Sequence, residues 1–514
     1  MNASNTTRIA RNTAWYGFET AISAVVGLST SIAIARNLGP SKMGPIIYMI
    51  WIAQVVSSLG GMGIPATTRK YMAEFLGMGD RGTARFIYFR TLLLQSALAT
   101  LATASLLAWV LRDANGEYKL ASALIVLSIW PAMVNFISAQ ANVATEELSR
   151  NLPASVTSMF VYFIAVAATV ILKWGVVGFG AAMLAMRLTD FLVRVFPTVS
   201  RILTWGTTHV FPPDLRRRMM AFAWQSLTSM AVALVVWDRS EFFLLHRLCP
   251  DIRQVSYYSV AFSMAERLLL SSMIFGSAAG ATIFAQYGRD KSKLPELTAS
   301  AFRYLALTSI PLHVIAAALA VPALLLLYGG QYRDAAMVVM LAPLLCMPKA
   351  FIGPIQSLLE SNERQRDIIL ATVLAGIVDI GVAWRLIPAH GAVGACIGNG
   401  AAQLTAVGIL WAIGIRVFKV RLPWVQVGKI SVISALASLT AHFIVVRMAP
   451  LTGILLGGTA SLTVLSALVY WLRVLEPEDH YRFSILAGML PRPIVKPAQY
   501  CLSVLARADS GSTV

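Results

Sequence analysis

The sequence TAWYGFETAISAVVGLSTSIAIARNLGPSKMGPIIYMIWIAQVVSSLGGMGIPAT occupies residues 13–67 and contains two apolar blocks separated by a short polar turn. The blocks are 13–35 and 45–67, and each is about as long as a helix that crosses ~30 Å of hydrocarbon. Between them lies RNLGPSKM, which carries two cations together with a glycine and a proline that interrupt a helix. This stretch therefore predicts a transmembrane helical hairpin.

Blocks of the same kind recur along the whole chain. They lie at 13–35, 45–67, 87–110, 120–142, 154–172, 176–198, 219–246, 256–285, 297–328, 335–359, 368–386, 391–415, 428–447 and 451–472. Only 13% of the 514 residues are charged and the mean hydropathy is +0.69, whereas soluble proteins carry about 25% charged residues. We therefore predict an all-α polytopic membrane protein with about fourteen transmembrane helices.

The net charge of +18 is explained by topology. Most lysines and arginines lie in the N-terminal segment and in the loops after every second block, so both termini are expected in the cytoplasm. No nucleic-acid partner is then needed to account for the charge. The four cysteines show no CxxC or Cys/His spacing, and there is no P-loop or nucleophile elbow. We expect no cofactor, no bound metal and no enzymatic activity.

Short motifs repeat at offsets a little above 200 residues, which is typical of transporters built from two related halves. RNLGP at 36–40 aligns with HRLCP at 246–250, and GEYKLA at 116–121 aligns with GQYRDA at 330–335. GVVG begins at Gly175 and its counterpart GAVG begins at Gly391. The repeat predicts two six-helix lobes related by a parallel pseudo-twofold axis.

The predicted organisation follows from this repeat and from the blocks it leaves over. An N-terminal lobe at 1–204 is joined by a cytoplasmic linker at 205–218 to a C-terminal lobe at 219–416. The last two blocks form a helical hairpin at 417–475, and a proline-containing cytoplasmic tail follows at 476–514.

Several of these segments resemble the polysaccharide transporter family, which includes the Wzx-type flippases of the MOP exporter superfamily. IARNLGPSKMGPIIYMIW and GGMGIPATTRKYMAEFLG carry the family's opening motif, an arginine, an LGP turn, a glycine and an aromatic, followed by GxG and an arginine. In this chain the motif residues are Arg36, Leu38, Gly39, Pro40, Gly44, Tyr48, Gly61, Gly63 and Arg69. WDRSEFFLLHRL, YYSVAFSMAERL and YGGQYRDA are similar to later segments of the same family.

The resemblance implies a flippase that moves an undecaprenyl-pyrophosphate-linked oligosaccharide across the bacterial inner membrane by alternating access. Its product would serve synthesis of a surface polysaccharide such as O-antigen or exopolysaccharide. The expected partners are membrane lipids and the lipid-linked sugar, and a polysaccharide polymerase is a candidate partner. Glu19, in place of an arginine in the first helix, departs from the lipid II flippase branch and argues against a peptidoglycan precursor. The alternative is a proton- or sodium-coupled multidrug or metabolite antiporter of the same superfamily.

Charges inside the apolar blocks are the candidate site, because each costs a few kcal/mol or more in the membrane. Arg187, Asp190 and Arg194 are spaced to share one helix face near mid-depth, and their spare positive charge favours an anion. The alternative for them is a structural ion pair. By resemblance, Arg267 supplies a further cation to the cavity, and its alternative is a pair with a carboxylate on the preceding helix. We predict that Arg267, Arg187 and Arg194 bind pyrophosphate.

The remaining intramembrane charges are candidates for ion coupling or gating. They are Glu19, Asp190, Asp238, Glu241, Glu266, Asp379 and Lys349. Two of these acids, Asp238 and Glu241, share a face nearer the outer surface, where they form either a solvated gate or an ion site. Lys349 and Asp379 form a mutual pair, or Asp379 carries the ion. Glu19 couples ions or pairs with a basic neighbour.

Overall fold

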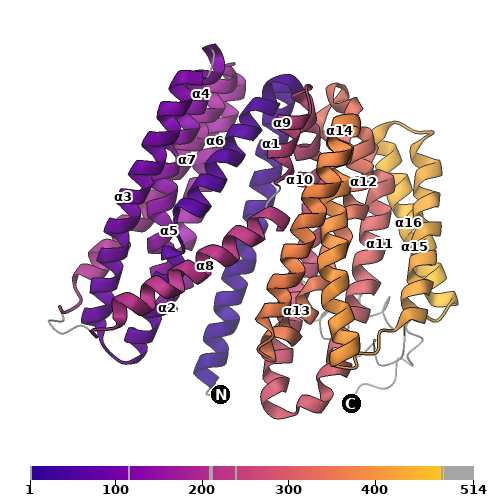
Figure 1. Cartoon of the computed structure of the whole chain (residues 1–514). Helices are drawn as coiled ribbons and strands as arrows, with labels where there is room; N and C mark the ends of the chain where they lie inside the picture. The colour runs from indigo at the N-terminus through magenta and orange to yellow at the C-terminus, as the bar shows by residue number, and fades with distance from the viewer. Residues whose placement is uncertain (1–2, 114–115, 208–211, 238–239, 476–478, 480–514) are drawn as a thin grey trace. The chain divides into compact units, whose positions relative to one another are not determined.

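The computed structural model describes residues 3–113, 116–207, 212–237, 240–475 and Asp479, and every regular element among them is a helix (Figure 1). The helices cluster into two compact units, Met1–Ser256 and Tyr257–Val514. Eleven helical stretches are long and apolar enough to cross a membrane. The prediction of an all-α, multi-pass membrane protein is confirmed.

The first unit holds the helices that precede the boundary. They are α1 (Ala3–Gly60), α2 (Ile64–Gly77), α3 (Arg81–Asp113), α4 (Gly116–Leu127), α5 (Ile129–Ala144), α6 (Leu152–Ile171), α7 (Gly175–Leu203), α8 (Leu215–Trp237) and α9 (Glu241–Leu248). Their shared core includes the buried residues Met72, Ile87, Tyr88 and Ile137. The Tyr88 hydroxyl lies 2.8 Å from the Ser138 hydroxyl, so α3 and α5 are joined by a buried hydrogen bond.

The second unit follows with seven helices in its described part, the first of which begins at the boundary. They are α10 (Arg253–Arg289), α11 (Leu294–Tyr328), α12 (Ala336–Cys346), α13 (Ile352–Ser361), α14 (Gln365–Val417), α15 (Trp424–Val445) and α16 (Pro450–Trp471). The indole N–H of Trp411 donates to the carbonyl of Phe351 at 3.1 Å. At one end of α11, the guanidinium of Arg303 donates to the buried carboxylate of Asp479 at 2.9 Å, and the hydroxyl of Tyr304 donates to it at 2.7 Å.

Two of the eleven stretches are each two spans joined at a glycine. The backbone of α1 turns at Gly39 (φ 70°, ψ 169°), and that of α14 turns at Gly391 (φ 51°, ψ −125°). Side chains other than hydrogen are disfavoured at such positive φ, so glycine allows the chain to reverse within two residues. With α8 and α9 in the block at 219–246, each of the fourteen predicted blocks overlaps at least one described helix, although a turn at Gly61–Gly63 breaks the block at 45–67.

The two halves of α14 pack against each other through small residues. A Cβ added to Gly394 would lie 2.6 Å from the carbonyl carbon and oxygen of Leu386, and one added to Gly398 would lie 2.9 Å from the Cβ of Ala383. Glycines four residues apart let two backbones approach closely, which is how helices associate when lipid removes the hydrophobic driving force. The turn at Gly391 and this glycine pair therefore form one close-packed hairpin.

The repeated motif has the same local structure in both units. Gly175 opens GVVG with φ 59°, as Gly391 opens GAVG with φ 51°. Three residues later, a Cβ added to Gly178 would lie 2.4 Å from the Cγ2 of Thr169, which repeats the crowding at Gly394. The motif therefore specifies a tight reversal between two packed helices.

Gly394→Ala is expected to destabilise the protein, because the new Cβ meets backbone atoms of Leu386 that cannot move aside. We expect a loss of about 1–3 kcal/mol, seen as a lower melting temperature in detergent. Gly408→Ala on the same helix is the control, since no atom lies within 4 Å of its Cβ and alanine favours helix there. Equal melting temperatures for the two variants would contradict the proposed packing.

Candidate functional site

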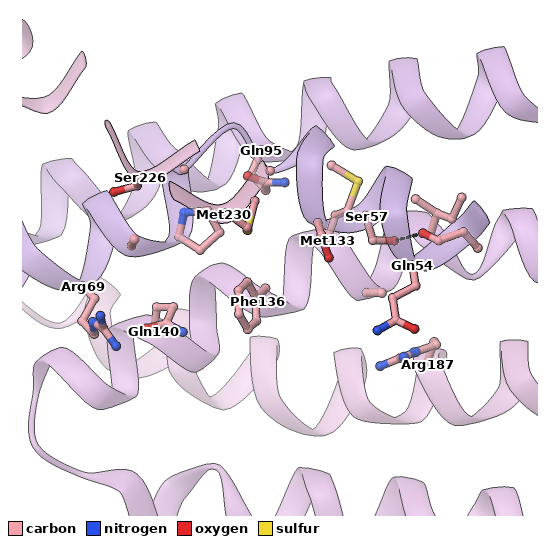
Figure 2. Close-up of a pocket in the computed structure, with 18 of the residues that line it drawn as sticks. Gln54, Ser57, Arg69, Gln95, Met133, Phe136, Gln140, Arg187, Ser226 and Met230 are labelled. Carbon is pink, nitrogen blue, oxygen red and sulfur yellow. Dashed lines mark hydrogen bonds between the residues drawn. The ribbon is translucent and has the colours of Figure 1, made fainter. Parts of the chain in front are cut away.

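A cavity of about 840 Å³ lies within the first unit, and we call it the amide-lined cavity (Figure 2). The second half of α1 and the start of α2 form one wall, and α3, α5, α7 and α8 complete it. Its polar lining consists mainly of side-chain amides and hydroxyls, from Gln54, Gln95, Gln140, Gln225, Ser57, Ser58, Ser128, Ser226 and Ser229. The volume suits a ligand of several hundred cubic ångströms held by convergent polar groups.

A break between α1 and α2 shapes this wall. Gly63 has φ 69°, a left-handed conformation, and a Cβ there would lie only 2.2 Å from the carbonyl oxygen of Ala223. Glycine therefore lets the backbone pass directly against α8. The break turns the small and polar residues around Gly61 toward the cavity instead of continuing an apolar helix surface.

The charges that line the amide-lined cavity are all positive in the part of the chain that the structure describes. Arg69 and Arg187 contribute guanidinium groups, and no carboxylate lines the cavity among the residues described. Figure 2 shows the two arginines at opposite ends, with Phe136 and Gln140 between them. A guanidinium presents five N–H donors and no acceptor, so this lining favours a ligand with several anionic or hydroxyl oxygens.

Gln95 is the clearest sign that a polar ligand or water belongs in the cavity. Its side chain is 1% exposed, and neither the amide nitrogen nor the amide oxygen has a hydrogen-bond partner within the described structure. The buried amide oxygen of Gln140 also lacks one. An unsatisfied buried amide costs about 1–3 kcal/mol, so a water or a polar ligand in the cavity would gain hydrogen bonds from these groups.

The predicted triad on α7 divides into a pair and a single cation. Asp190 accepts hydrogen bonds from Arg194 and from the amide of Asn135 on α5, both at 2.6 Å. Arg194 also donates to the hydroxyl of Ser155 at 3.0 Å, and both members of the pair are mostly buried. Arg187 forms no hydrogen bond or ion pair with the described residues and lines the amide-lined cavity. It is the spare positive charge of the triad.

Four predicted residues lie in the second unit. Arg267 is half-buried on α10, and its buried Nε has no hydrogen-bond partner among the residues described. Glu266 and Lys349 both lie within electrostatic reach of the Cys346 thiol, so they belong to one neighbourhood. Asp379 is fully buried on α14. The roles predicted for these residues stay predictions.

Of the three remaining predicted acids, the structure describes the side chain of only one. Glu241 is fully buried at the start of α9. Asp238 lies outside the described residues, and so does the side chain of Glu19, although its backbone belongs to α1.

The sequence analysis missed the glutamines of the cavity. Gln54, Gln95 and Gln140 each interrupt an apolar block, which is the signal that could have identified them. Arg69 was noted only as part of a motif, and the structure places it in the same lining.

Comparison with known proteins adds a family and a fold. Residues 33–337 match a family described as polysaccharide biosynthesis protein. No curated protein matches the sequence.

Solved structures of transporters share the architecture. Lipid II flippase MurJ, in an inward closed conformation, aligns at 15% identity over 88% of this chain and 98% of its own, with a TM-score of 0.67. An inward-facing multidrug resistance MATE family transporter of the MOP superfamily aligns at 15% identity over 78% and 95%, with a TM-score of 0.64. A MOP superfamily transporter from Pyrococcus furiosus, described as having a binding pocket of reverse polarity, aligns at 15% over 80% and 95%, with a TM-score of 0.56. These likenesses show the fold alone.

The assignment of Asp190 and Arg194 as a pair predicts a reciprocal pattern of stability. Asp190→Leu leaves the buried guanidinium of Arg194 without its carboxylate, and Arg194→Leu leaves the carboxylate of Asp190 without its cation. Each single variant should lose about 3–5 kcal/mol of folding stability. The double variant removes both charges and should recover most of the melting temperature. Leu192→Ala, on an exposed position of α7, is the control and should change little. A double variant no more stable than either single one would rule out the pairing.

Proposed function

The chain belongs to the family of polysaccharide biosynthesis proteins, and from this we propose that it is a flippase for an undecaprenyl-pyrophosphate-linked oligosaccharide. It would carry this unit across the bacterial cytoplasmic membrane by alternating access, for synthesis of a surface polysaccharide. The observation that carries the proposal is the sign of charge in the amide-lined cavity, which has two arginines and, among the described residues, no carboxylate.

The chemistry of the substrate explains why such a cavity is needed. A pyrophosphate bears at least two negative charges, which cannot enter hydrocarbon without compensation. Arg187 is suited to this task because the Asp190–Arg194 pair leaves its guanidinium uncommitted. The amides of Gln54, Gln95 and Gln140 supply both donors and acceptors, which match the hydroxyl groups of a sugar.

We propose Arg267 as a further cation for the pyrophosphate, as the resemblance implies. It is half-buried, and its buried Nε is available for a further hydrogen bond. Arg194 supports Arg187 by holding Asp190 in an ion pair, which keeps that carboxylate from neutralising the site. The acids and Lys349 remain candidates for coupling the transport cycle to an ion gradient.

The alternative is a proton- or sodium-coupled antiporter for cationic drugs or metabolites, and a multidrug resistance MATE family transporter shares this fold. Such a carrier needs carboxylates in its cavity, because a desolvated cation must be paired. Asp190, which lies three residues from Arg187 on α7, already accepts hydrogen bonds from Arg194 and Asn135. The charge of the cavity therefore favours the flippase.

The proposed location follows from topology. Lysine and arginine are concentrated in the loops on the side of both termini, which favours the cytoplasm for both ends. The substrate would be loaded from that side and released outside, where a polymerase would use it.

Arg187→Gln is expected to lower export of surface polysaccharide about tenfold or more, because a charge-assisted hydrogen bond to the substrate is worth about 1.5–3 kcal/mol. Arg187→Lys keeps the charge and should retain part of the activity. Three quantities are measured together: the surface polymer, the lipid-linked oligosaccharide that accumulates in the membrane, and the protein level by immunoblot. Arg90→Gln, an exposed arginine on α3, is the control. Export at the wild-type level from Arg187→Gln would remove this residue from the site.

Arg267→Ala is expected to abolish export while the protein still reaches the membrane, since the pyrophosphate would lose a cation that pairs with it. Arg289→Ala, in the exposed last turn of the same helix α10, should export normally. Undiminished export from Arg267→Ala, or drug resistance conferred by the intact protein in place of polysaccharide export, would count against the proposal.

A further inference from the structure

A second cavity, of about 610 Å³, lies in the first unit beside the amide-lined cavity, and we call it the aromatic cavity. Its lining comes from the second half of α1, from α3 and α4, and from the end of α9 with the residues that follow. None of the motifs or charges considered above assigns it a role.

Flat rings dominate this lining. The ring of Tyr48 is stacked on that of His246, with centroids 3.8 Å apart and planes inclined by 17°. Trp109 on α3 is 43% exposed and lines the same cavity. An indole with that much free surface, next to a stacked pair, offers apolar faces on which a flat ligand packs.

Polar groups line the aromatic cavity together with these rings. Arg247 supplies guanidinium donors, and Ser122 and the Tyr48 phenol supply hydroxyls that donate or accept. Within the described lining there is again no carboxylate, so a cationic ligand would be unpaired here. An acyl chain would gain nothing from these donors. A saccharide, with apolar C–H faces and a rim of hydroxyls, satisfies both the rings and the polar groups.

The two cavities follow each other along the same helices. Met49 lines the aromatic cavity and the next residue, Ile50, lines the amide-lined cavity. At a rise of 1.5 Å per residue, Tyr48 lies about 9 Å along α1 from Gln54. Gln54 lies near Arg187 in the amide-lined cavity (Figure 2). On α3, Trp109 lies about 21 Å along the helix from Gln95. A ligand held at Arg187 by its phosphates can thus extend several sugar units toward the aromatic rings.

We propose that the aromatic cavity is a saccharide-binding subsite for the oligosaccharide part of the lipid-linked substrate, an inference that rests on the proposed function. The phosphates bind in the amide-lined cavity, and the distal sugars pack on Trp109 and on the Tyr48–His246 stack. Discrimination among the distal sugars of different oligosaccharides then resides in the aromatic cavity, because the phosphates and the lipid are common to all such substrates.

Photo-crosslinking tests the contact directly. The full-length protein is produced in polysaccharide-exporting cells with benzoylphenylalanine in place of Trp109, of Phe136 in the amide-lined cavity, or of Phe163, a 46% exposed residue on α6. Membranes from these cells are supplied with a radiolabelled nucleotide sugar, so that only sugars carry label, and are irradiated. The protein is then purified and its label is counted. Mild acid then cleaves the bond between sugar and pyrophosphate, so label attached through a sugar stays on the protein and label attached through lipid is lost.

We expect acid-stable label with Trp109→benzoylphenylalanine and only acid-labile label, or none, with Phe163→benzoylphenylalanine. Absent or acid-labile label at position 109 overturns the saccharide subsite. When that result is accompanied by label at position 136, the proposed function stands without the subsite. Absence of label at both 109 and 136 overturns the proposed function as well.

Discussion

The membrane interior contains no water to satisfy polar groups, and the rest of the structure depends on this constraint. Every described span is helical because a helix pairs its own backbone amides. Hydroxyls inside the spans turn back to the same helix: the side chain of Thr30 donates to the carbonyl of Val26 at 2.8 Å, and that of Ser57 donates to Ala53 at 2.7 Å. Asp190 is tolerated because Arg194 and Asn135 surround it.

Because polar groups inside the membrane need hydrogen-bond or ion-pair partners, buried groups that lack such partners in the described structure are candidates for binding a ligand. Gln95 and Arg187 face one cavity, where the first has a buried amide without partners and the second a guanidinium outside any described ion pair. A protein that only needed a stable core would have filled these positions with apolar side chains. Under the proposed function, the amide-lined cavity is a polar compartment inside the membrane for a hydrophilic cargo, and the aromatic cavity continues it with a different surface chemistry.

The sequence predicted the spans and one residue of the cavity, because block length and an intramembrane charge are both visible in a single chain. Arg187 is conspicuous for this reason. The amide of Gln95 is not, since it is uncharged and a glutamine within an apolar block equally serves packing. Which amides meet depends on how α3 and α5 rotate about their axes, and Asn135 reaches Asp190 only because α5 and α7 pack together. The break at Gly63 likewise lies inside a block that hydropathy treats as continuous.

The hairpin of α14 has a consequence for how the protein is made. Its two spans are joined at Gly391 with no loop between them, and Gly394 and Gly398 hold them in contact from the first turn. Because no polar loop separates the two spans, we expect them to insert into the bilayer together as a helical hairpin. The insertion machinery is then expected to handle residues 365–417 as one unit, and Asp379, which is fully buried in the folded protein, enters the membrane with that unit.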